Sequence, residues 1–451
     1  MISDMRIEPA RKISGELRLP GDKSISHRAA ILAALASNRA QIANFSTSED
    51  CAATLRCLGQ LGVKIERDRT SVIIEGIGLD GLRAPDAPLD CGNSGSTMRM
   101  LAGVLAGQNF TSVLTGDESL RSRPMKRIIE PLELMGARIW SENGRAPLRI
   151  EGNRPLKAIS YEMPVASAQV KSCILLAGLN AQGRTEVIEP QGATRDHTER
   201  MLRSFGVPVE SKTIERNGVT MEAISIKYGK QFNAHDGTIP GDISSAAFFI
   251  AAAALLPGSK LIINQVGLNP TRTQLLQVLR SLGVDVRIDF ISHHDWIAEG
   301  FYEPFGYVSI TGGAGLAPVK DGESNILRAP LISQLIDELP VLAVLGSQVL
   351  GGFSIRDAVE LRVKESDRIR AVVENLRAMG VEVEEHDDGL TIPARTQLRG
   401  AKLDAHGDHR IAMAFTIAAL IAEGTSEITG AGSVRVSFPE FFDLLESVVV
   451  G

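Results

Sequence analysis

The chain has 451 residues, of which 44% are hydrophobic and 23% charged, a composition typical of a globular protein large enough for two cores. Its net charge of −6 and its 4% of aromatic residues argue against a nucleic-acid-binding surface, which needs a basic field and usually stacking rings. There is no apolar run of membrane-spanning length, no signal-peptide core in residues 1–15 and no CxxC pair among the four cysteines, so we expect a cytoplasmic protein with reduced thiols.

An internal repeat of roughly seventy residues occurs six times along the chain. Each copy begins with a short polar turn, often containing glycine, and continues into an Ala-rich helix that is apolar nearly all round. Such a helix is expected to be buried. The six segments are 19–36, 91–107, 164–183, 240–258, 333–352 and 406–424.

A second helix follows each of these segments and is amphipathic, so one of its faces should meet solvent. Five of the second helices end at a glycine followed by a short stretch that contains a β-branched residue, and a sixth, truncated copy begins at Phe441. Glycine predicts a helix stop, and the stretches 63–65, 284–288 and 381–383 predict strands. The five glycines are Gly62, Gly136, Gly206, Gly283 and Gly380.

Six αβ modules exceed what one core usually organises, and the natural division is three plus three. We therefore predict two pseudo-symmetric domains. Residues 21–237 form the domain of repeats 1–3, and residues 1–20 plus 238–451 form the domain of repeats 4–6. The chain crosses between them near 20 and 237, because the strand expected at 15–19 precedes the first repeat helix.

The starts of the buried helices are the places to look for chemistry, because a helix N-terminus carries unpaired N–H donors and partial positive charge that attract anions. Residues 21–28 (GDKSISHR) and 92–99 (GNSGSTMR) open the first two helices, and RSRP at 121–124 precedes another helix. Lysine and arginine there suit phosphate or carboxylate recognition. Each motif taken alone also fits a capped helix with solvent-facing charges.

The later helix starts carry further polar residues. Ser167 and Gln169 open the third helix, and Arg195 lies in the segment ATRDHTER. Asp337 stands in an otherwise apolar segment, where an acid is costly unless it is paired or used, so it is a candidate general base. Its neighbour Glu338 fits a helix cap. The run RVKESDR at 362–368 is either a salt-bridged helix face or a site, and GDHR at 407–410 opens the sixth helix.

Taken in order, these motifs resemble the 5-enolpyruvylshikimate-3-phosphate synthase family across essentially the whole chain. The matching pieces are LPGDKSISHR, GNSGSTMR, LRSRP, SAQ, DELP, RVKESDR, GDHR and SFPEFF. The wording GDKSISHR and the alanine in Ser167-Ala168-Gln169 are similar to the class II members. The resemblance implies an α/β fold of two domains, each an inside-out barrel of three αβ modules, with the substrates in the cleft between them.

The resemblance also implies the reaction, which is transfer of the enolpyruvyl group of phosphoenolpyruvate to the 5-hydroxyl of shikimate 3-phosphate through a tetrahedral intermediate. The implied catalytic residues are Lys23, Asp337 and Glu365, with Asp337 taking the hydroxyl proton. The implied ligands of shikimate 3-phosphate are Lys23, Ser24, Arg28, Ser167, Gln169, Arg195, Asp337 and Lys364. The implied ligands of phosphoenolpyruvate are Lys23, Asn93, Gly95, Arg123, Gln169, Arg368 and Arg410.

No cofactor, metal, nucleic acid or membrane partner is expected, and the resemblance favours a monomer. His293, His294 and Asp295 have no partner motif for a zinc site. Val436 stands where many family members carry a lysine, so one phosphate contact is either missing or supplied by Arg435. Gly95 keeps the small residue beside phosphoenolpyruvate, which implies room for the inhibitor glyphosate.

Three other functions remain as alternatives. The nearest is UDP-N-acetylglucosamine enolpyruvyl transferase, but that family usually has a Lys-Asn pair where this chain has Lys23-Ser24, and a reactive cysteine in a loop that here, at 115–124, has none. The second is a non-catalytic anion-binding repeat protein, in which no acid or base is poised for catalysis. Turnover that depends on Asp337 and Glu365 would indicate an enzyme instead. The third, an RNA-end-processing enzyme of related architecture, would need a basic groove.

Overall fold

The computed structural model describes residues 4–190, 194–216, 218–227, 231–291, 301–313, 315–318 and 325–451. The chain divides into two compact units. The first unit contains residues 20–240 and 292–303, and the second contains residues 1–19, 241–291 and 304–451. Each unit has its own hydrophobic core.

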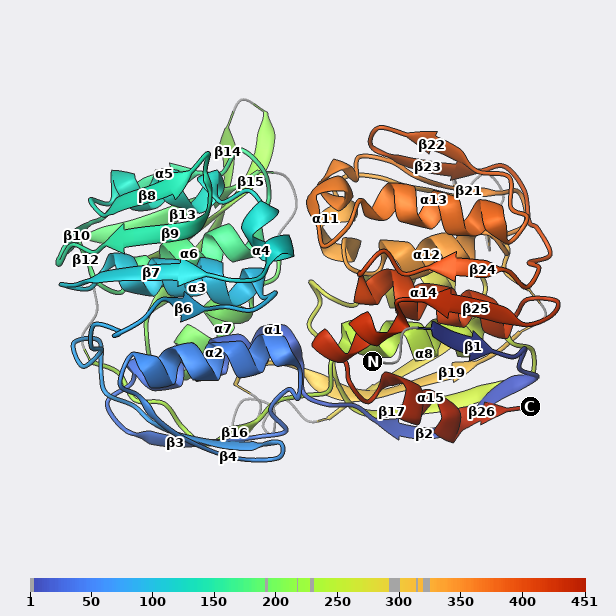
Figure 1. The fold of residues 1–451 in the computed structure, drawn as a ribbon, viewed down its shortest axis with the longest axis horizontal. Coiled ribbons are helices and arrows are strands. Elements are labelled where there is room, and N and C mark those ends of the chain that lie inside the picture. The colour runs from blue at the N-terminus through green and yellow to red at the C-terminus, as the bar shows by residue number, and fades with distance from the viewer. Residues whose placement is uncertain are drawn as a thin grey trace. The chain divides into compact units, whose positions relative to one another are not determined.

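The six predicted apolar segments form helices whose side chains are almost entirely buried, which confirms this part of the sequence analysis. In the first unit they are α1 (Lys23–Leu35), α3 (Gly95–Ala106) and α6 (Ala168–Gly178). In the second unit they are α8 (Ile243–Leu255), α12 (Leu339–Gly346) and α14 (His409–Leu420). Figure 1 shows α8, α12 and α14 stacked between the strands of their unit.

The amphipathic helices are also present in all six modules. They are α2 (Glu49–Gln60), α5 (Lys126–Leu134), α7 (His197–Ser204), α9 (Gln274–Ser281), α13 (Arg368–Ala378) and α15 (Phe441–Val448). Short helical turns complete the set: α4 (Glu118–Ser122), α11 (Ile332–Leu335), η1 (Val359–Val363) and η2 (Ala431–Val436). The fifth apolar segment is thus split into α11 and α12, and Asp337 lies at the break.

The glycines that end five amphipathic helices all have positive φ, from 78° to 104°. The residue after each glycine donates its N–H to the carbonyl five residues earlier, as Val381 does to Leu376. This is the Schellman helix end, in which glycine relieves the cost of the left-handed conformation. It also explains why the strand expected at 381–383 begins later, at Glu384, since Val381 still belongs to the end of α13.

The sheets of the first unit repeat one topology, in which a parallel pair is followed by two antiparallel pairs. Their strand orders are β16-β3-β5-β4, β6-β7-β9-β8 and β11-β13-β15-β14, and β10 pairs separately with β12. The strands are β3 (Arg39–Ala43), β4 (Lys64–Asp68), β5 (Ser71–Glu75), β6 (Leu89–Asp90), β7 (Thr111–Thr115), β8 (Arg138–Glu142), β9 (Arg145–Glu151), β10 (Leu156–Lys157), β11 (Ser160–Glu162), β12 (Ala181–Gln182), β13 (Arg184–Glu189), β14 (Val209–Arg216), β15 (Val219–Lys227) and β16 (Gly237–Thr238).

The second unit repeats the pattern with variations at the chain ends. Its strand orders are β18-β19-β17-β2-β26, β20-β21-β23-β22 and β1-β25-β24. The strands are β1 (Asp4–Ile7), β2 (Lys12–Arg18), β17 (Lys260–Gly267), β18 (Asp285–Phe290), β19 (Phe305–Thr311), β20 (Ile326–Leu327), β21 (Phe353–Ile355), β22 (Glu384–His386), β23 (Gly389–Ile392), β24 (Lys402–Asp404), β25 (Ser426–Thr429) and β26 (Val449–Val450). Strand β2 pairs in parallel with β17 and antiparallel with β26.

A short segment between β18 and β19 belongs to the first unit. Phe301 is fully buried in that unit's core, where its ring packs edge-on against Phe205 at 5.9 Å. Oε1 of Glu303 lies 2.7 Å from Nδ1 of His197, and the carbonyl of Tyr302 accepts a hydrogen bond from Arg200 at 3.0 Å. The chain therefore leaves the second unit here and returns to it at Pro304.

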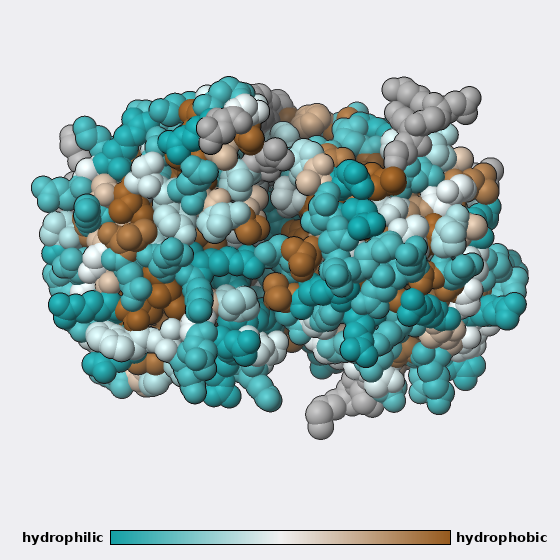
Figure 2. All heavy atoms as spheres, turned by 90° about the horizontal axis from the view of Figure 1, so that it is seen from above, coloured by the Kyte–Doolittle hydropathy of each residue, from teal (hydrophilic) through white to brown (hydrophobic). Residues whose placement is uncertain are grey.

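The face shown in Figure 2 is mostly polar, with hydrophobic residues in several places. Exposed large side chains include Trp140, Phe290 and Val359. Among the described residues, no helix is both long and apolar enough to cross a membrane.

Close packing of α3 against α6 gives a stability prediction. A methyl group at Gly103 of α3 would overlap the carbonyl oxygen of Cys173 in α6, so Gly103→Ala should destabilise the first unit by about 1–3 kcal/mol. Gly59 in α2 has no neighbour within 4 Å of such a methyl group, so Gly59→Ala should instead stabilise by roughly 0.5–1 kcal/mol. Thermal unfolding measures both, and equal effects of the two variants would contradict the packing argument.

Candidate active site

The start of α1 presents a half-buried lysine beside an acid. Asp22 caps the helix by accepting from the N–H of Ile25, and Lys23 is the first helical residue. The ammonium of Lys23 lies 2.8 Å from Oδ2 of Asp50, and its side chain is 20% exposed. Ser24 is also partly exposed at this helix start. A cation with a neighbouring carboxylate at a helix N-terminus suits an anionic ligand.

Arg28 is buried one turn further along α1 and joins three helices. It donates to Thr198 Oγ1 at 2.7 Å, to Ser172 Oγ at 2.7 Å and to the carbonyl of Ser24 at 2.8 Å. Burial lowers the pKa of its guanidinium, Glu199 acts against this shift and nearby Arg195 adds to it, so that the pKa falls to about 10. Arg28 and Arg195 are thus close enough to interact, although at least three N–H groups of Arg28 bond to the protein itself.

A buried charge network holds the helix that follows Arg195. Lys171 of α6 is fully buried and lies 2.8 Å from Glu189 and 2.7 Å from Glu199 of α7. Burial alone would lower the pKa of Lys171, but the two carboxylates raise it to about 12, so it remains charged. Thr194 donates to the same Glu189. These bonds fix the position of α7 and of the residues just before it.

The start of α3 is tied to Arg123 through Asn93. The amide oxygen of Asn93 accepts from Arg123 at 2.6 Å, and its nitrogen donates to Asp117 at 2.7 Å. Gly95, the first residue of α3, has no side chain to fill the space beside these groups. A methyl group there would lie 2.8 Å from Nη1 of Arg99 and 3.5 Å from Nη1 of Arg123.

The start of α6 joins the same group. Ser167 caps this helix by accepting from the N–H of Val170. Gln169 accepts from Arg99 through its oxygen and donates to Ser96 at 2.9 Å through its nitrogen. The structure thus brings Asn93, Gly95, Arg123 and Gln169 together around Arg99, a residue to which the sequence analysis gave no role. We call these residues, with Lys23, Arg28 and Arg195, the first-unit cluster.

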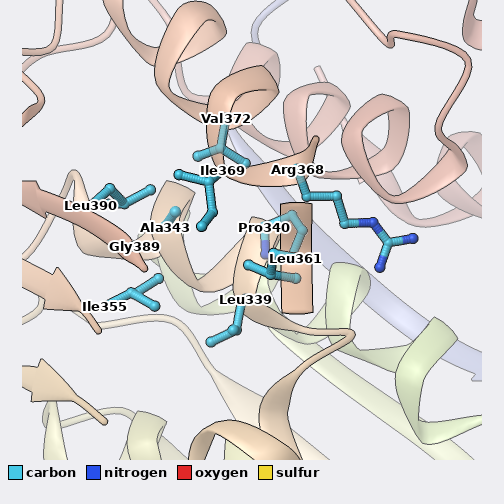
Figure 3. A pocket seen from close by; sticks show the side chains of 10 residues that line it. All are labelled: Leu339, Pro340, Ala343, Ile355, Leu361, Arg368, Ile369, Val372, Gly389 and Leu390. Carbon is cyan, nitrogen blue, oxygen red and sulfur yellow. The ribbon is translucent and has the colours of Figure 1, made fainter. Parts of the chain in front are cut away.

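In the second unit, Arg368 is the centre of a buried group of acids. It donates to Asp408 at 2.7 Å and to Glu365 at 2.7 Å, and its Nη1 lies 3.6 Å from Asp337 Oδ1. Burial alone would lower its pKa, but Asp408 and Glu365 raise it above the usual range, so the guanidinium stays charged. Figure 3 shows the aliphatic stem of Arg368 beside apolar side chains, with the guanidinium pointing away from them.

Lys364 and Arg410 complete the second-unit cluster, which we define as Asp337, Lys364, Glu365, Arg368 and Arg410. Burial lowers the pKa of Lys364, and Arg368 lowers it further, while Asp337 acts against the shift. Arg410 follows Asp408, which caps α14, and donates to Ser244 Oγ at 2.7 Å and to the carbonyl of Asp337 at 3.2 Å. Two arginines, a lysine and two acids therefore meet within one unit.

The contacts of Glu338 were not predicted from the sequence. The residue stands at the N-cap position of α12, but its side chain makes no capping bond. It is buried, accepts from the Ser244 hydroxyl and lies 3.7 Å from Arg272. Its position in an apolar segment was the same signal that singled out Asp337, whereas Ser244 gave no signal beyond that of an ordinary helix start.

No group of three or more His, Cys, Asp or Glu side chains in the described part of the chain has the arrangement of a metal site. His293, His294 and Asp295 lie outside the described residues. Arg435 is exposed on η2, next to the partly buried Val436.

Comparison with known proteins finds one family over nearly the whole chain. Residues 7–445 match the model of the EPSP synthase (3-phosphoshikimate 1-carboxyvinyltransferase) family. The chain is 49% identical over 449 residues to the 3-phosphoshikimate 1-carboxyvinyltransferase of Koribacter versatilis (strain Ellin345), covering 99% of this chain and 100% of that protein. It is 47% identical over 446 residues to the enzyme of the same name from Solibacter usitatus (strain Ellin6076), covering 99% of each.

The fold comparison gives the same result. A solved structure of EPSP synthase from Acinetobacter baumannii superposes with a TM-score of 0.84 at 39% sequence identity, covering 99% of this chain and 98% of that one. The expected fold of repeated αβ modules is therefore confirmed. The chain belongs to the EPSP synthase (3-phosphoshikimate 1-carboxyvinyltransferase) family.

Proposed function

We propose that the first-unit and second-unit clusters carry out the reaction of this family, the transfer of the enolpyruvyl group of phosphoenolpyruvate to the 5-hydroxyl of shikimate 3-phosphate. The observation that carries this proposal is the buried Arg368, which holds a candidate base, Asp337, and a candidate proton donor, Glu365, on one guanidinium. A fixed cation with two acids can bind an anion and move protons beside it.

The reaction has two steps. The 5-hydroxyl oxygen attacks C2 of phosphoenolpyruvate while its proton passes to Asp337, and the methylene carbon C3 gains a proton. The resulting tetrahedral intermediate then loses a proton from C3, and the bond between C2 and the phosphate oxygen breaks. Phosphate leaves with that oxygen, and the double bond between C2 and C3 is restored. We propose Glu365 for the proton at C3, with Lys23 as the alternative donor.

Binding of the substrates follows the charges. Both substrates are anions that repel each other in water, and fixed cations together with helix N-termini offset this repulsion. We propose that Arg123, Arg368 and Arg410 bind phosphoenolpyruvate, with Lys23, Asn93, Gly95 and Gln169 also contacting it. We propose that shikimate 3-phosphate contacts Lys23, Ser24, Arg28, Ser167, Gln169, Arg195, Asp337 and Lys364.

We also propose that the chain works as a monomer in the cytoplasm. All four cysteines are buried with free thiols, which suits a reducing compartment. Sedimentation equilibrium measures the oligomeric state directly.

Purified protein should release phosphate from phosphoenolpyruvate with shikimate 3-phosphate as acceptor, and not with UDP-N-acetylglucosamine, without added metal. Asp337→Asn and Glu365→Gln should each lower kcat by about 10²–10⁴-fold, because each removes a proton-transfer group. Steady-state phosphate assays measure this. Glu374→Gln is the matched control, since Glu374 forms an exposed ion pair with Arg370 on α13. Full turnover in both site variants would contradict the assigned roles.

Gly95→Ala should raise the inhibition constant of glyphosate more than the KM for phosphoenolpyruvate. The added methyl group would press on Arg99 and approach Arg123, and a longer ligand at these guanidinium groups has less room to adjust. Inhibition kinetics on the unaltered protein and on Gly95→Ala measure the change in the inhibition constant and the change in KM. Gly59→Ala, on α2, is the control for an added methyl group that meets no neighbour. A millimolar inhibition constant for the unaltered protein would show that glyphosate does not fit here.

A further inference from the structure

We infer that Glu338 is a positioning residue for Arg410 and that it acts through the hydroxyl group of Ser244. This inference rests on the proposed function, in which Arg410 binds phosphoenolpyruvate. It adds two residues, from α8 and from the start of α12, to the machinery that recognises this substrate.

The burial of Glu338 calls for a physical reason. Its side chain is only 3% exposed, and within the described part of the chain Oε2 has no hydrogen-bond partner. Removing a carboxylate from water costs free energy unless charges and hydrogen bonds compensate it. Here Oε1 lies 3.7 Å from Arg272 and 3.8 Å from Arg410, so two guanidinium groups stabilise the negative charge.

The hydroxyl group of Ser244 connects the acid to Arg410. Ser244 is fully buried at the start of α8, where its N–H donates to the capping residue Asp242 at 2.8 Å. Its Oγ donates to Glu338 Oε1 and accepts from Arg410 Nη1 at 2.7 Å. A hydroxyl group has a single proton. Because the carboxylate can only accept, the hydroxyl proton forms its hydrogen bond with Glu338, and the lone pairs of Oγ face Arg410.

Holding one nitrogen fixes the whole guanidinium, since the group is planar and its donors form a rigid fork. Nη1 of Arg410 also donates to the carbonyl of Asp337 at 3.2 Å, and the guanidinium carbon lies 5.9 Å from the centre of the Phe248 ring. One edge of Arg410 is thus bound to the protein in a defined orientation. We expect this orientation to set the direction in which its other donors meet an anion.

The test is the effect of Glu338→Gln and Ser244→Ala on the KM for phosphoenolpyruvate and on the KM for shikimate 3-phosphate. Glutamine has nearly the same shape as glutamate, but it is neutral and its amide nitrogen can donate to Ser244. The hydroxyl group is then no longer held with its lone pairs towards Arg410. Each variant should raise the KM for phosphoenolpyruvate roughly tenfold, as expected for a charged hydrogen bond, and change the KM for shikimate 3-phosphate less than about twofold. Ser244→Thr keeps a hydroxyl group and should restore most of the affinity.

A double variant tests the connection between the two residues. If Glu338 acts through Ser244, then Glu338→Gln should have little further effect in the Ser244→Ala protein, whereas independent roles would give multiplied effects. Thr416→Val is the matched control for a lost buried hydrogen bond, because Thr416 donates only to the carbonyl of Ala412 on α14, at 2.8 Å. It should leave both KM values unchanged, and thermal unfolding shows whether each variant is folded.

Arg410→Gln separates the inference from the proposed function. If this variant leaves the KM for phosphoenolpyruvate unchanged, the assignment of Arg410 as a ligand fails. If it raises that KM while Glu338→Gln and Ser244→Ala do not, the positioning role alone is overturned. Multiplied effects in the double variant, or equal changes in both KM values, also overturn it. If Glu338→Gln does not fold, the Ser244 variants still decide the question.

Discussion

A buried cation must be paired, and this constraint shapes the second-unit cluster and the support of α7 in the first unit. Arg368 is surrounded by Asp408, Glu365 and Asp337, and Lys171 lies between Glu189 and Glu199. An anion-binding enzyme needs its positive charges ready before the substrate arrives, yet bare cations in a protein interior are costly. The carboxylates solve this problem by balancing the buried positive charges, and the proposed mechanism also uses two of them, Asp337 and Glu365, for proton transfer.

The architecture supplies these charges in a regular way. Each module buries one helix and exposes the next, and several of the buried helices begin at a polar turn where a capping residue stands close to a cation. Asp22 precedes Lys23, and Asp408 precedes Arg410 by two residues. Repetition of one local arrangement therefore provides several helix starts suited to an anion, so that no single loop has to supply every proposed ligand.

The modules could be predicted from the sequence because their signals are local. Helical periodicity, capping residues and the glycine stops act within a few residues, and all twelve expected helices occur in the described chain. The break before α12 was harder to see, because the apolar pattern continues through it. The link from Glu338 through Ser244 to Arg410 could not be predicted, since it joins three distant segments whose residue types are each ordinary. Phe301 was missed for the same reason, because an apolar residue does not indicate which core it enters.

The pairing of β2 has a consequence for how the chain is made. Strand β2 is synthesised before residues 20–240 of the first unit, but its partners, β17 and β26, both follow those residues in the chain. The core of the first unit also needs Phe301, which is synthesised after α8, α9 and β18 of the other unit. Neither unit can therefore be completed on the ribosome in a simple N-to-C order. Until those partners are made, β2 lacks its neighbouring strands, and an unpaired strand edge is open to association with other chains.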